Sequence, residues 1–432
     1  MKWTKAAIAD APRIRILLLT NNDSDNVGDQ IIEQSVVSLI KAAVKNLGYP
    51  LRRLEISSRA IGMISQRYLS TRDDKHLAAA RREVAEADVV IFGGAPVFNY
   101  RYQNFYLKTI TLIELAQEYG VPVLFSSVGV EPFDASDERS VALQRALALP
   151  CVRQATTRDD LESLRAYISS DEKPVSLVSD PAVVADVVFG TPAAVERDGE
   201  TTTIGLVVTR SGLFRDNGIP FSVNDQCQMW LSIIAGLKAR GYDYRLFTTG
   251  HFADEVVLDA LVRTGRVAFT KSRIAVNSPE ELVEEIAGCD AVIAYRLHAS
   301  ITAFAYDIPS IGLSWNFKVP AFYDSIGYPE RALSPERWVA SEILSALDIA
   351  LGSGVVKDES LTMSVYRTLF DGLKSVLDAE SDQVPYSYAQ LMRHLPRYEG
   401  TSTEAYRAKM QRKLRRVYQP YGEKIAKLNL FK

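Results

Sequence analysis

Short hydrophobic runs alternate with longer amphipathic stretches through the first half of the chain. The runs are nearly continuous in apolar residues, which is typical of strands buried on both faces of a parallel sheet. Between them, apolar residues recur at helical spacing, for example over residues 30–47 and 110–119. The predicted strands lie at residues 15–20, 51–56, 88–92, 122–126, 154–157 and 175–178. This alternation predicts a mainly parallel sheet with helices on both faces.

The same alternation begins again near residue 204. Before it, residues 189–203 are rich in Gly, Pro, Thr and charged residues, as linkers often are. Strands are predicted in this half at residues 204–208, 244–247, 290–293 and 311–313. The chain is therefore predicted to be an α/β protein with two doubly wound, Rossmann-like domains that face a cleft, as in the glycosyltransferase-B architecture. The expected first domain covers residues 1–195, the second 200–375, and a basic helical tail 376–432.

Composition narrows the class of protein. A chain of 432 residues exceeds the size at which one core usually stops growing, which agrees with two domains. The formal net charge of -3 gives no reason to expect a nucleic-acid partner. Three widely spaced cysteines offer neither a disulfide framework nor a zinc pattern. Without a signal peptide or a long apolar run, the protein is expected in the cytoplasm.

The segment from residue 401 onward is strongly basic. Its apolar residues fall at mostly helical spacing, so a helix that packs on the body of the protein is the simpler interpretation. The alternative is contact with an anionic surface, which would place the protein at the inner face of the membrane. The basic residues are Arg407, Lys409, Arg412, Lys413, Arg415, Arg416, Lys424, Lys427 and Lys432.

Charged residues follow neighbouring strands of the second predicted sheet. Arg296 and His298 come just after one strand, Lys318 follows the next, and Arg210 ends the first strand of this domain. Because the carboxyl ends of parallel strands meet at one edge, these side chains should form a cationic pocket. Arg and Lys suit a phosphate or carboxylate, and a histidine there can carry a proton. A hydrogen-bonded histidine at a helix start is the simpler reading of His298, and His251 is a second cleft candidate.

Polar loops on the same edge of the first domain supply further candidates. Asp29 either caps a helix or faces the cleft, Arg158 reaches the cleft or pairs with a carboxylate, and Asp180 caps a turn or lines the site. Asp23-Ser24-Asp25 has the form of a metal-binding DxD motif but is more simply a solvated loop. The loop residues expected to contact an acceptor are Asn26, Gly28, Gly93, Gly94, Asn99 and Asp180.

Taken in order, several short motifs resemble the polysaccharide pyruvyl transferase family. They are Asn26-Val27-Gly28-Asp29, Phe92-Gly93-Gly94, Val128-Gly129-Val130-Glu131-Pro132, Arg158-Asp159, Ser179-Asp180-Pro181-Ala182, and Tyr295-Arg296-Leu297-His298-Ala299 through Asp307-Ile308-Pro309 to Lys318. The resemblance covers residues 15–330. It departs at Ala95, where the family has a glycine-rich triplet, and at Ala294, where the family has Gly.

The resemblance implies a chemistry. Phosphoenolpyruvate donates a pyruvyl group that forms a cyclic ketal on a sugar of a surface polysaccharide or of its lipid-linked precursor, with no metal and no cofactor. The family's Arg-x-His element falls on Arg296 and His298, and its later lysine on Lys318. In this scheme Arg158 and Arg210 also hold the donor, His298 is the proton donor, and Asp29 or Asp180 orients or deprotonates the acceptor hydroxyl.

Two other functions remain open at this stage. A nucleotide-sugar glycosyltransferase of the same architecture would use Arg and Lys to hold a diphosphate. The sequence lacks the His-Pro pair of some sialyltransferases, which counts against that subclass. A non-catalytic scaffold of polysaccharide assembly is the third reading, although the presence of Arg296, His298 and Lys318 argues against it.

Overall fold

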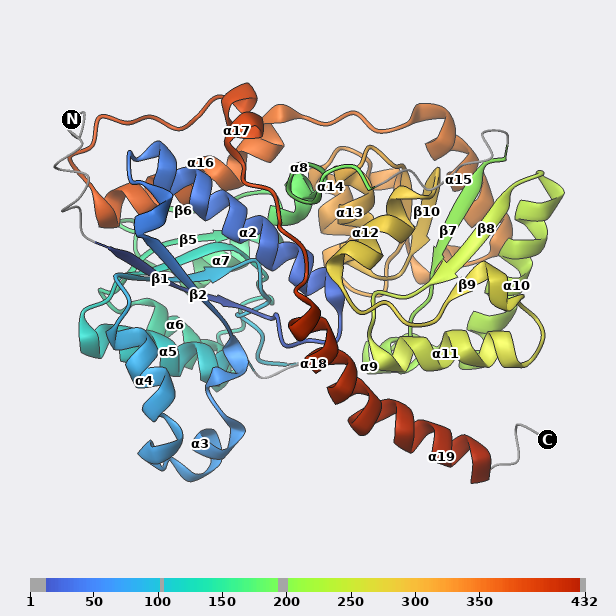
Figure 1. The fold of residues 1–432 in the computed structure, drawn as a ribbon, viewed down its shortest axis with the longest axis horizontal. Coiled ribbons are helices and arrows are strands. Elements are labelled where there is room, and N and C mark those ends of the chain that lie inside the picture. The colour runs from blue at the N-terminus through green and yellow to red at the C-terminus, as the bar shows by residue number, and fades with distance from the viewer. Residues whose placement is uncertain (1–12, 102–104, 193–200, 428–432) are drawn as a thin grey trace.

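The structure, a computed structural model, describes residues 13–101, 105–192 and 201–427. Figure 1 shows two α/β domains side by side, with the last helices crossing from one to the other. Each domain contains one six-stranded sheet in which every strand pair is parallel. The prediction of two doubly wound α/β domains is therefore confirmed. Part of the predicted linker, residues 193–200, lies outside the described residues.

The first sheet has the strand order β2-β1-β3-β4-β5-β6. Its central strands are apolar and almost fully buried, because helices cover both faces. The order reverses between β1 and β3, so the loops after these two strands border the same crevice. The strands are β1 (Ile14–Thr20), β2 (Leu54–Ala60), β3 (Val89–Gly93), β4 (Val123–Val128), β5 (Val152–Thr157) and β6 (Val175–Leu177). The helices are α2 (Val27–Asn46), α3 (Gln66–Thr71), α4 (Ala78–Ala85), α5 (Tyr106–Tyr119), α6 (Glu138–Leu147), α7 (Leu161–Tyr167) and α8 (Ala185–Phe189).

The second sheet has the order β12-β11-β10-β7-β8-β9, and its reversal lies between β7 and β10. The loops after β7 and β10 therefore border one crevice, as they do in the first domain. The strands are β7 (Thr203–Val207), β8 (Asp243–Phe247), β9 (Ser272–Arg273), β10 (Ala291–Ala294), β11 (Ser310–Leu313) and β12 (Ala332–Leu333). The helices are α9 (Gly212–Asp216), α10 (Val223–Ala239), α11 (Phe252–Arg263), α12 (Pro279–Ala287), α13 (Leu297–Ala305), α14 (Lys318–Ser325) and α15 (Ala340–Ser353).

Helix α2 joins the two domains. It packs on its own sheet and also contacts α12 and α13 of the second domain. At its first residue, the backbone N–H of Val27 donates to the carbonyl oxygen of Thr249 at 2.8 Å. Apolar side chains of both domains consequently merge into one buried cluster around α2. This contact fixes the start of α2 against the strand ends of the second sheet.

The C-terminal segment does not stay with the second domain. Helix α16 (Glu359–Leu377) returns to the first domain, beside α2 and β4 (Figure 1). There the amide of Gln154 donates to the carbonyl oxygen of Thr368 at 2.8 Å. Residues 200–375 were predicted to form the second domain, which assigns most of α16 to the wrong sheet. The apolar side chains of α16 pack on the first domain instead. Helix α17 (Tyr388–His394) follows.

The basic tail forms α18 (Thr403–Lys413), a π-helical turn and α19 (Gln419–Lys427), which pass below α11 in the view of Figure 1. Lys413 is buried in an ion pair with Glu255 and also donates to the side chain of Asn277. The hydroxyl of Tyr418 donates to the same Glu255 at 2.6 Å. The tail therefore packs on the body of the second domain, as the simpler sequence interpretation has it.

Candidate active site

One cavity of ≈ 450 Å³ lies where the loops after the strands of both sheets meet. It receives residues from the loops that follow β1, β3, β4, β5, β7, β8, β10 and β11, because the carboxyl ends of parallel strands lie on one edge of each sheet. The lining includes most of the predicted site residues. These are Asn26, Asp29, Asn99, Arg158, Arg210, His251, Arg296, His298 and Lys318.

Arg296 is held by a buried carboxylate. It directly precedes α13, and its Nε and Nη2 donate to the two oxygens of Asp254 at 2.8 Å each. Asp254 is fully buried in the first turn of α11 and also accepts the backbone N–H of Arg210 at 3.0 Å. A bidentate pair of this kind fixes the plane of the guanidinium group. Arg296 therefore presents its remaining N–H groups to the cavity in one orientation.

His298 lies in the first turn of α13 and touches the start of α2. Its Nδ1 is 3.1 Å from the side-chain nitrogen of Asn26, the N-cap of α2, and 3.7 Å from Oδ1 of Asp29. The approach is close because residue 28 is glycine: a Cβ there would come within 2.4 Å of the Cβ of His298. The contact between the two domains therefore shapes the surroundings of this ring.

Burial shifts the pKa values of the two central acid–base groups in opposite directions and thereby favours the neutral form of both. It raises the pKa of the Asp29 carboxyl to about 6. It holds the pKa of the His298 ring well below its usual range, and three neighbouring cations act in the same direction. Those cations are Arg158, Arg296 and Lys318. Without a bound anion, the ring is therefore neutral at pH 7.

Two cations of the cavity have no carboxylate within ion-pair distance among the described residues: Lys318 and Arg210. Lys318 is the first residue of α14, and burial lowers the pKa of its ammonium group. The Nε of Arg210 is buried and makes no hydrogen bond within the described ranges. Such cations favour a bound anion, because no carboxylate in the described part of the chain neutralises their charge at contact distance.

Arg158 reaches the cavity and is also paired. It makes a buried ion pair with Asp180 and lies 3.8 Å from Asp159, so both sequence interpretations of this arginine hold together. Arg158 lies just before the helix that follows it, because Asp160 is the N-cap and α7 starts at Leu161. Asp180 caps the turn after it, accepting from the N–H of Ala182, and is not among the cavity-lining residues.

The two glycines of the Phe92-Gly93-Gly94 motif lie behind the cavity wall. Gly93 packs against Leu18 and Val36, and a Cβ at Gly94 would come within 2.2 Å of Ile32. Gly94 also has φ +62°, a conformation that strongly favours glycine. The two glycines allow β3 to pack closely on α2. Asn99, in the loop that follows, lines the cavity.

Several residues of the site were missed from the sequence. Asp254 escaped notice because an acidic residue in the first turn of a helix is common and its partner is 42 positions away. Glu131 belongs to the Val-Gly-Val-Glu-Pro motif, which was the available signal; it is 2% exposed and accepts the N–H groups of Tyr100 and Arg101. Other lining residues not singled out are Asn21, Trp315 and Asn316.

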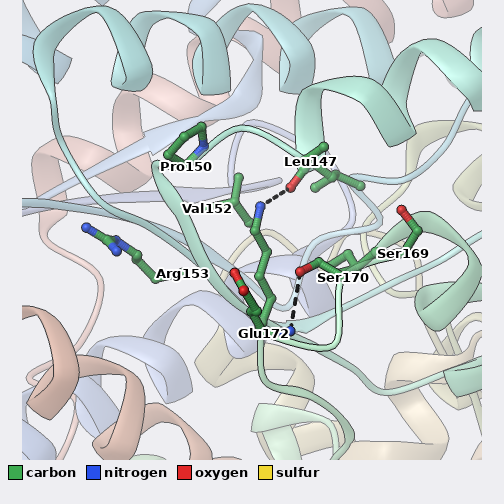
Figure 2. Close-up of a pocket in the computed structure, with 10 residues that line it drawn as sticks. Leu147, Pro150, Val152, Arg153, Ser169, Ser170 and Glu172 are labelled. Atoms are coloured by element: carbon green, nitrogen blue, oxygen red, sulfur yellow. Dashed lines mark hydrogen bonds between the residues drawn. The ribbon is translucent and has the colours of Figure 1, made fainter.

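A second cavity, of ≈ 360 Å³, lies at the start of β5, beside the end of α6 and on the edge of the sheet opposite the strand ends (Figure 2). Lys173 lines it, but its ammonium group donates to the carbonyl oxygens of Leu147 and Leu149 at 2.7 and 2.9 Å. This lysine therefore neutralises the negative end of α6. The chemistry-bearing residues are concentrated in the first cavity.

Replacing Asp29 by Asn should make stability less dependent on pH. The carboxyl holds its proton more tightly when folded, with a pKa of about 6 against 3.8, so wild-type stability falls as pH rises between these values. Relative to wild type, Asp29→Asn should gain stability through that window, on the order of 3 kcal/mol by pH 7. Urea unfolding of both proteins at pH 4, 5, 6 and about 7 measures the difference. A difference that stays constant with pH would contradict the buried-acid interpretation of Asp29.

The sequence profile of the family described as polysaccharide pyruvyl transferase matches residues 26–316, from the N-cap of α2 to the loop before Lys318. The chain belongs to the polysaccharide pyruvyl transferase family. No curated protein matches the chain significantly. Asp29, Arg296 and His298 of this family member lie inside the matched range, which spans parts of both domains.

Solved structures with a similar fold include UDP-GlcNAc 2-epimerases. The UDP-GlcNAc 2-epimerase of Methanocaldococcus jannaschii is 13% identical, with a TM-score of 0.51 over 83% of this chain and 98% of that chain. A putative UDP-N-acetylglucosamine 2-epimerase from Listeria monocytogenes is 10% identical, with a TM-score of 0.57 over 87% and 99%. MnaA of S. aureus with UDP is 12% identical, with a TM-score of 0.51 over 87% and 100%. At such low sequence identity, the similarity shows the fold alone. It confirms the glycosyltransferase-B-like arrangement of the two domains.

Two further features of this pyruvyl transferase family member concern metals and membranes. In the described part of the chain, no three His, Cys, Asp or Glu side chains gather closely enough to hold a metal ion. None of the helices in the same part combines the length and apolar composition needed to cross a membrane.

Proposed function

We propose that the protein transfers a pyruvyl group from phosphoenolpyruvate to a sugar of a surface polysaccharide or of its lipid-linked precursor and forms a cyclic ketal. The observation that best supports this donor is the pair Lys318 and Arg210, the cavity cations without a carboxylate at ion-pair distance among the described residues. Phosphoenolpyruvate carries a phosphate and a carboxylate, which these cations and the oriented Arg296 suit.

The reaction needs one group that gives a proton and later recovers it. Protonation of the methylene carbon of the donor leaves a cationic centre at the adjacent carbon. One sugar hydroxyl attacks that centre and returns its proton to the protein. A second hydroxyl then displaces the phosphate, which leaves with the second proton. Of the groups that line the cavity, we assign the first proton to His298 or Asp29.

On the first-domain side, we propose that Asn99 contacts the acceptor sugar. Trp315, from the second domain, offers an aromatic face in the same cavity, while its indole N–H already donates to the carbonyl oxygen of Tyr295 at 2.8 Å. An aromatic face and a side-chain amide together suit the apolar and hydroxyl faces of a sugar ring. Gly93, Gly94 and Asp180 are left out of the acceptor site, because they do not line the cavity.

Acceptor-dependent phosphate release from phosphoenolpyruvate tests the function. The wild-type protein is incubated with phosphoenolpyruvate and a panel of lipid-linked and synthetic glycosides, and the masses of the products are measured by mass spectrometry. The expected product is heavier by one pyruvate less one water, and Lys318→Gln should raise the KM for phosphoenolpyruvate. If a glycoside instead gains a sugar when nucleotide sugars are supplied, the protein is a glycosyltransferase and the proposal is wrong.

We further propose that the tail attracts the protein to an anionic lipid surface. Lys413 is buried in its ion pair with Glu255, but Arg412, Arg415 and Arg416 near it are exposed. Basic residues near lipid contribute about 1 kcal/mol each. An anionic bilayer is therefore a suitable partner for this face of α18 and α19, and a lipid-linked acceptor would lie at the same surface.

Sedimentation with vesicles of neutral or anionic lipid measures this attraction. Replacing Arg412, Arg415 and Arg416 together by Gln should abolish a binding that is specific for anionic vesicles and weakens with salt. A matched control removes the same charge from the first domain, at the exposed Arg67, Arg72 and Arg82. Equal loss in both triple variants, or no binding by wild type, would show that the tail is not a membrane contact.

A further inference from the structure

The side chain of Asn26 has one orientation that satisfies both of its neighbours. It is the N-cap of α2, and its carbonyl oxygen accepts the backbone N–H of Gly28 at 3.3 Å. The amide nitrogen is then the atom that faces Nδ1 of His298, at 3.1 Å. Because an amide NH₂ group only donates, Nδ1 has to accept. A histidine with an accepting Nδ1 carries its single hydrogen on Nε2.

We propose that Asn26 is a positioning residue that holds His298 as the neutral tautomer with hydrogen on Nε2, so that the ring gives the donor substrate a hydrogen bond rather than a proton. The role toward substrate rests on the proposed function, whereas the tautomer is a property of the free protein. Nε2 has no hydrogen-bond partner among the residues that the structure describes, and His298 lines the cavity. A ligand oxygen in the cavity is the natural acceptor for that N–H.

The surroundings of His298 disfavour the imidazolium form. The ring lies at the N-terminal ends of two helices, α2 and its own α13, and both helix dipoles present partial positive charge there. Burial and the nearby cations lower the pKa of the ring further, and Asp29 is the acidic group that opposes them at 3.7 Å. The cations come from the loop after β5, from α13 and from α14: Arg158, Arg296 and Lys318.

With His298 neutral, we assign delivery of the proton to the methylene carbon to Asp29, which lines the cavity and whose pKa is raised to about 6. Its carboxyl group gives that proton, the resulting carboxylate takes the proton of the attacking hydroxyl, and the group returns to its first state. Phosphate leaves with the proton of the second hydroxyl. The side chain of Asn21 donates to Oδ2 of Asp29 at 2.9 Å, which orients the other oxygen toward His298.

The tautomer is measured directly by long-range ¹H–¹⁵N correlation spectra of protein labelled at histidine, with His298→Gln identifying the signal. Wild type at pH 7 should show an unprotonated Nδ1 and a protonated Nε2. In Asn26→Asp, which keeps the cap and the shape, the second carboxylate oxygen accepts, so Nδ1 should become protonated. Asn26→Ser keeps the cap without the NH₂ group and should give a mixture of tautomers.

The control is Asn217→Asp. It adds the same charge to the same cavity, where Asn217 contacts the carbonyl oxygen of Leu213 rather than His298, and Nδ1 should stay unprotonated. A protonated Nδ1 in wild type, or an unchanged spectrum in both Asn26 variants, overturns the proposal. In the transfer assay, Asn26→Asp should lower kcat by up to about 10⁴-fold, the cost of a catalytic histidine held in the wrong tautomer. If no acceptor is pyruvylated by wild type, the proposed function fails while the spectra still decide the tautomer.

Discussion

Asp254→Ala should abolish pyruvyl transfer and lower the free energy of unfolding by about 3–5 kcal/mol, the cost of leaving a buried charge unpaired. Asp254 is fully buried and binds Arg296 through two hydrogen bonds of 2.8 Å. Removing it leaves Arg296 without its orienting partner and also frees the backbone N–H of Arg210, which Asp254 accepts. Urea unfolding and the acceptor-dependent phosphate-release assay measure the two effects.

The control is the exposed pair of Arg240, the C-cap of α10, and Asp348 in α15, which are 3.0 Å apart. Asp348→Ala should cost less than about 1 kcal/mol and leave transfer unchanged. If Asp254→Ala does not fold, Asp254→Asn keeps the shape and removes only the charge. It should raise the KM for phosphoenolpyruvate as Arg296 loses its fixed orientation. A KM and kcat equal to those of wild type in a folded Asp254 variant would show that Arg296 needs no orienting carboxylate.

Gly28→Ala should reduce kcat by about 10²-fold, the loss typical of a catalytic group displaced by about 1 Å. The added Cβ would lie 2.6 Å from Nδ1 of His298, so the ring has to move. The start of α2 has little freedom to move instead, because Val27 donates to Thr249 of the second domain. Steady-state kinetics measure the loss, and the histidine spectra described above report whether the ring has moved.

Gly352→Ala is the matched control for the glycine. Gly352 also lies in a helix, α15, and a Cβ there would meet nothing within 4 Å. This variant should gain about 0.5–1 kcal/mol of stability from the better helix propensity of alanine and should keep full activity. Full activity in Gly28→Ala as well would mean that the contact between α2 and His298 does not position the ring.

Local patterns of apolar residues were sufficient to predict most strands of the two sheets. Strands such as β3 and β10 are continuous in apolar residues, and that pattern follows directly from burial on both faces. The short edge strands β9 and β12 were not predicted, because two residues carry no periodicity. Helix α14 was also missed. Its first residue, Lys318, was placed at a strand end instead, which still put it on the correct edge of the sheet.

The candidate site was predictable as far as strand direction decides it. Parallel strands end on one edge, so residues that follow them, such as Arg296 and Arg210, were expected to meet. What those residues do to one another was not predictable. The predicted proton donor, His298, is neutral in the free site because burial and three cations act on it together, and only the structure assembles them.

Periodicity and composition within short stretches were enough to predict the α/β class, the two parallel sheets and the strand edges that carry the polar loops. The tertiary structure alone decided which ends meet: Asn26 with His298, 272 positions apart, and Lys413 with Glu255, 158 positions apart. It also decided that α16 returns to the first domain. Such contacts depend on how whole helices pack between domains, and burial there, rather than any local pattern, sets the charge states of Asp29 and His298.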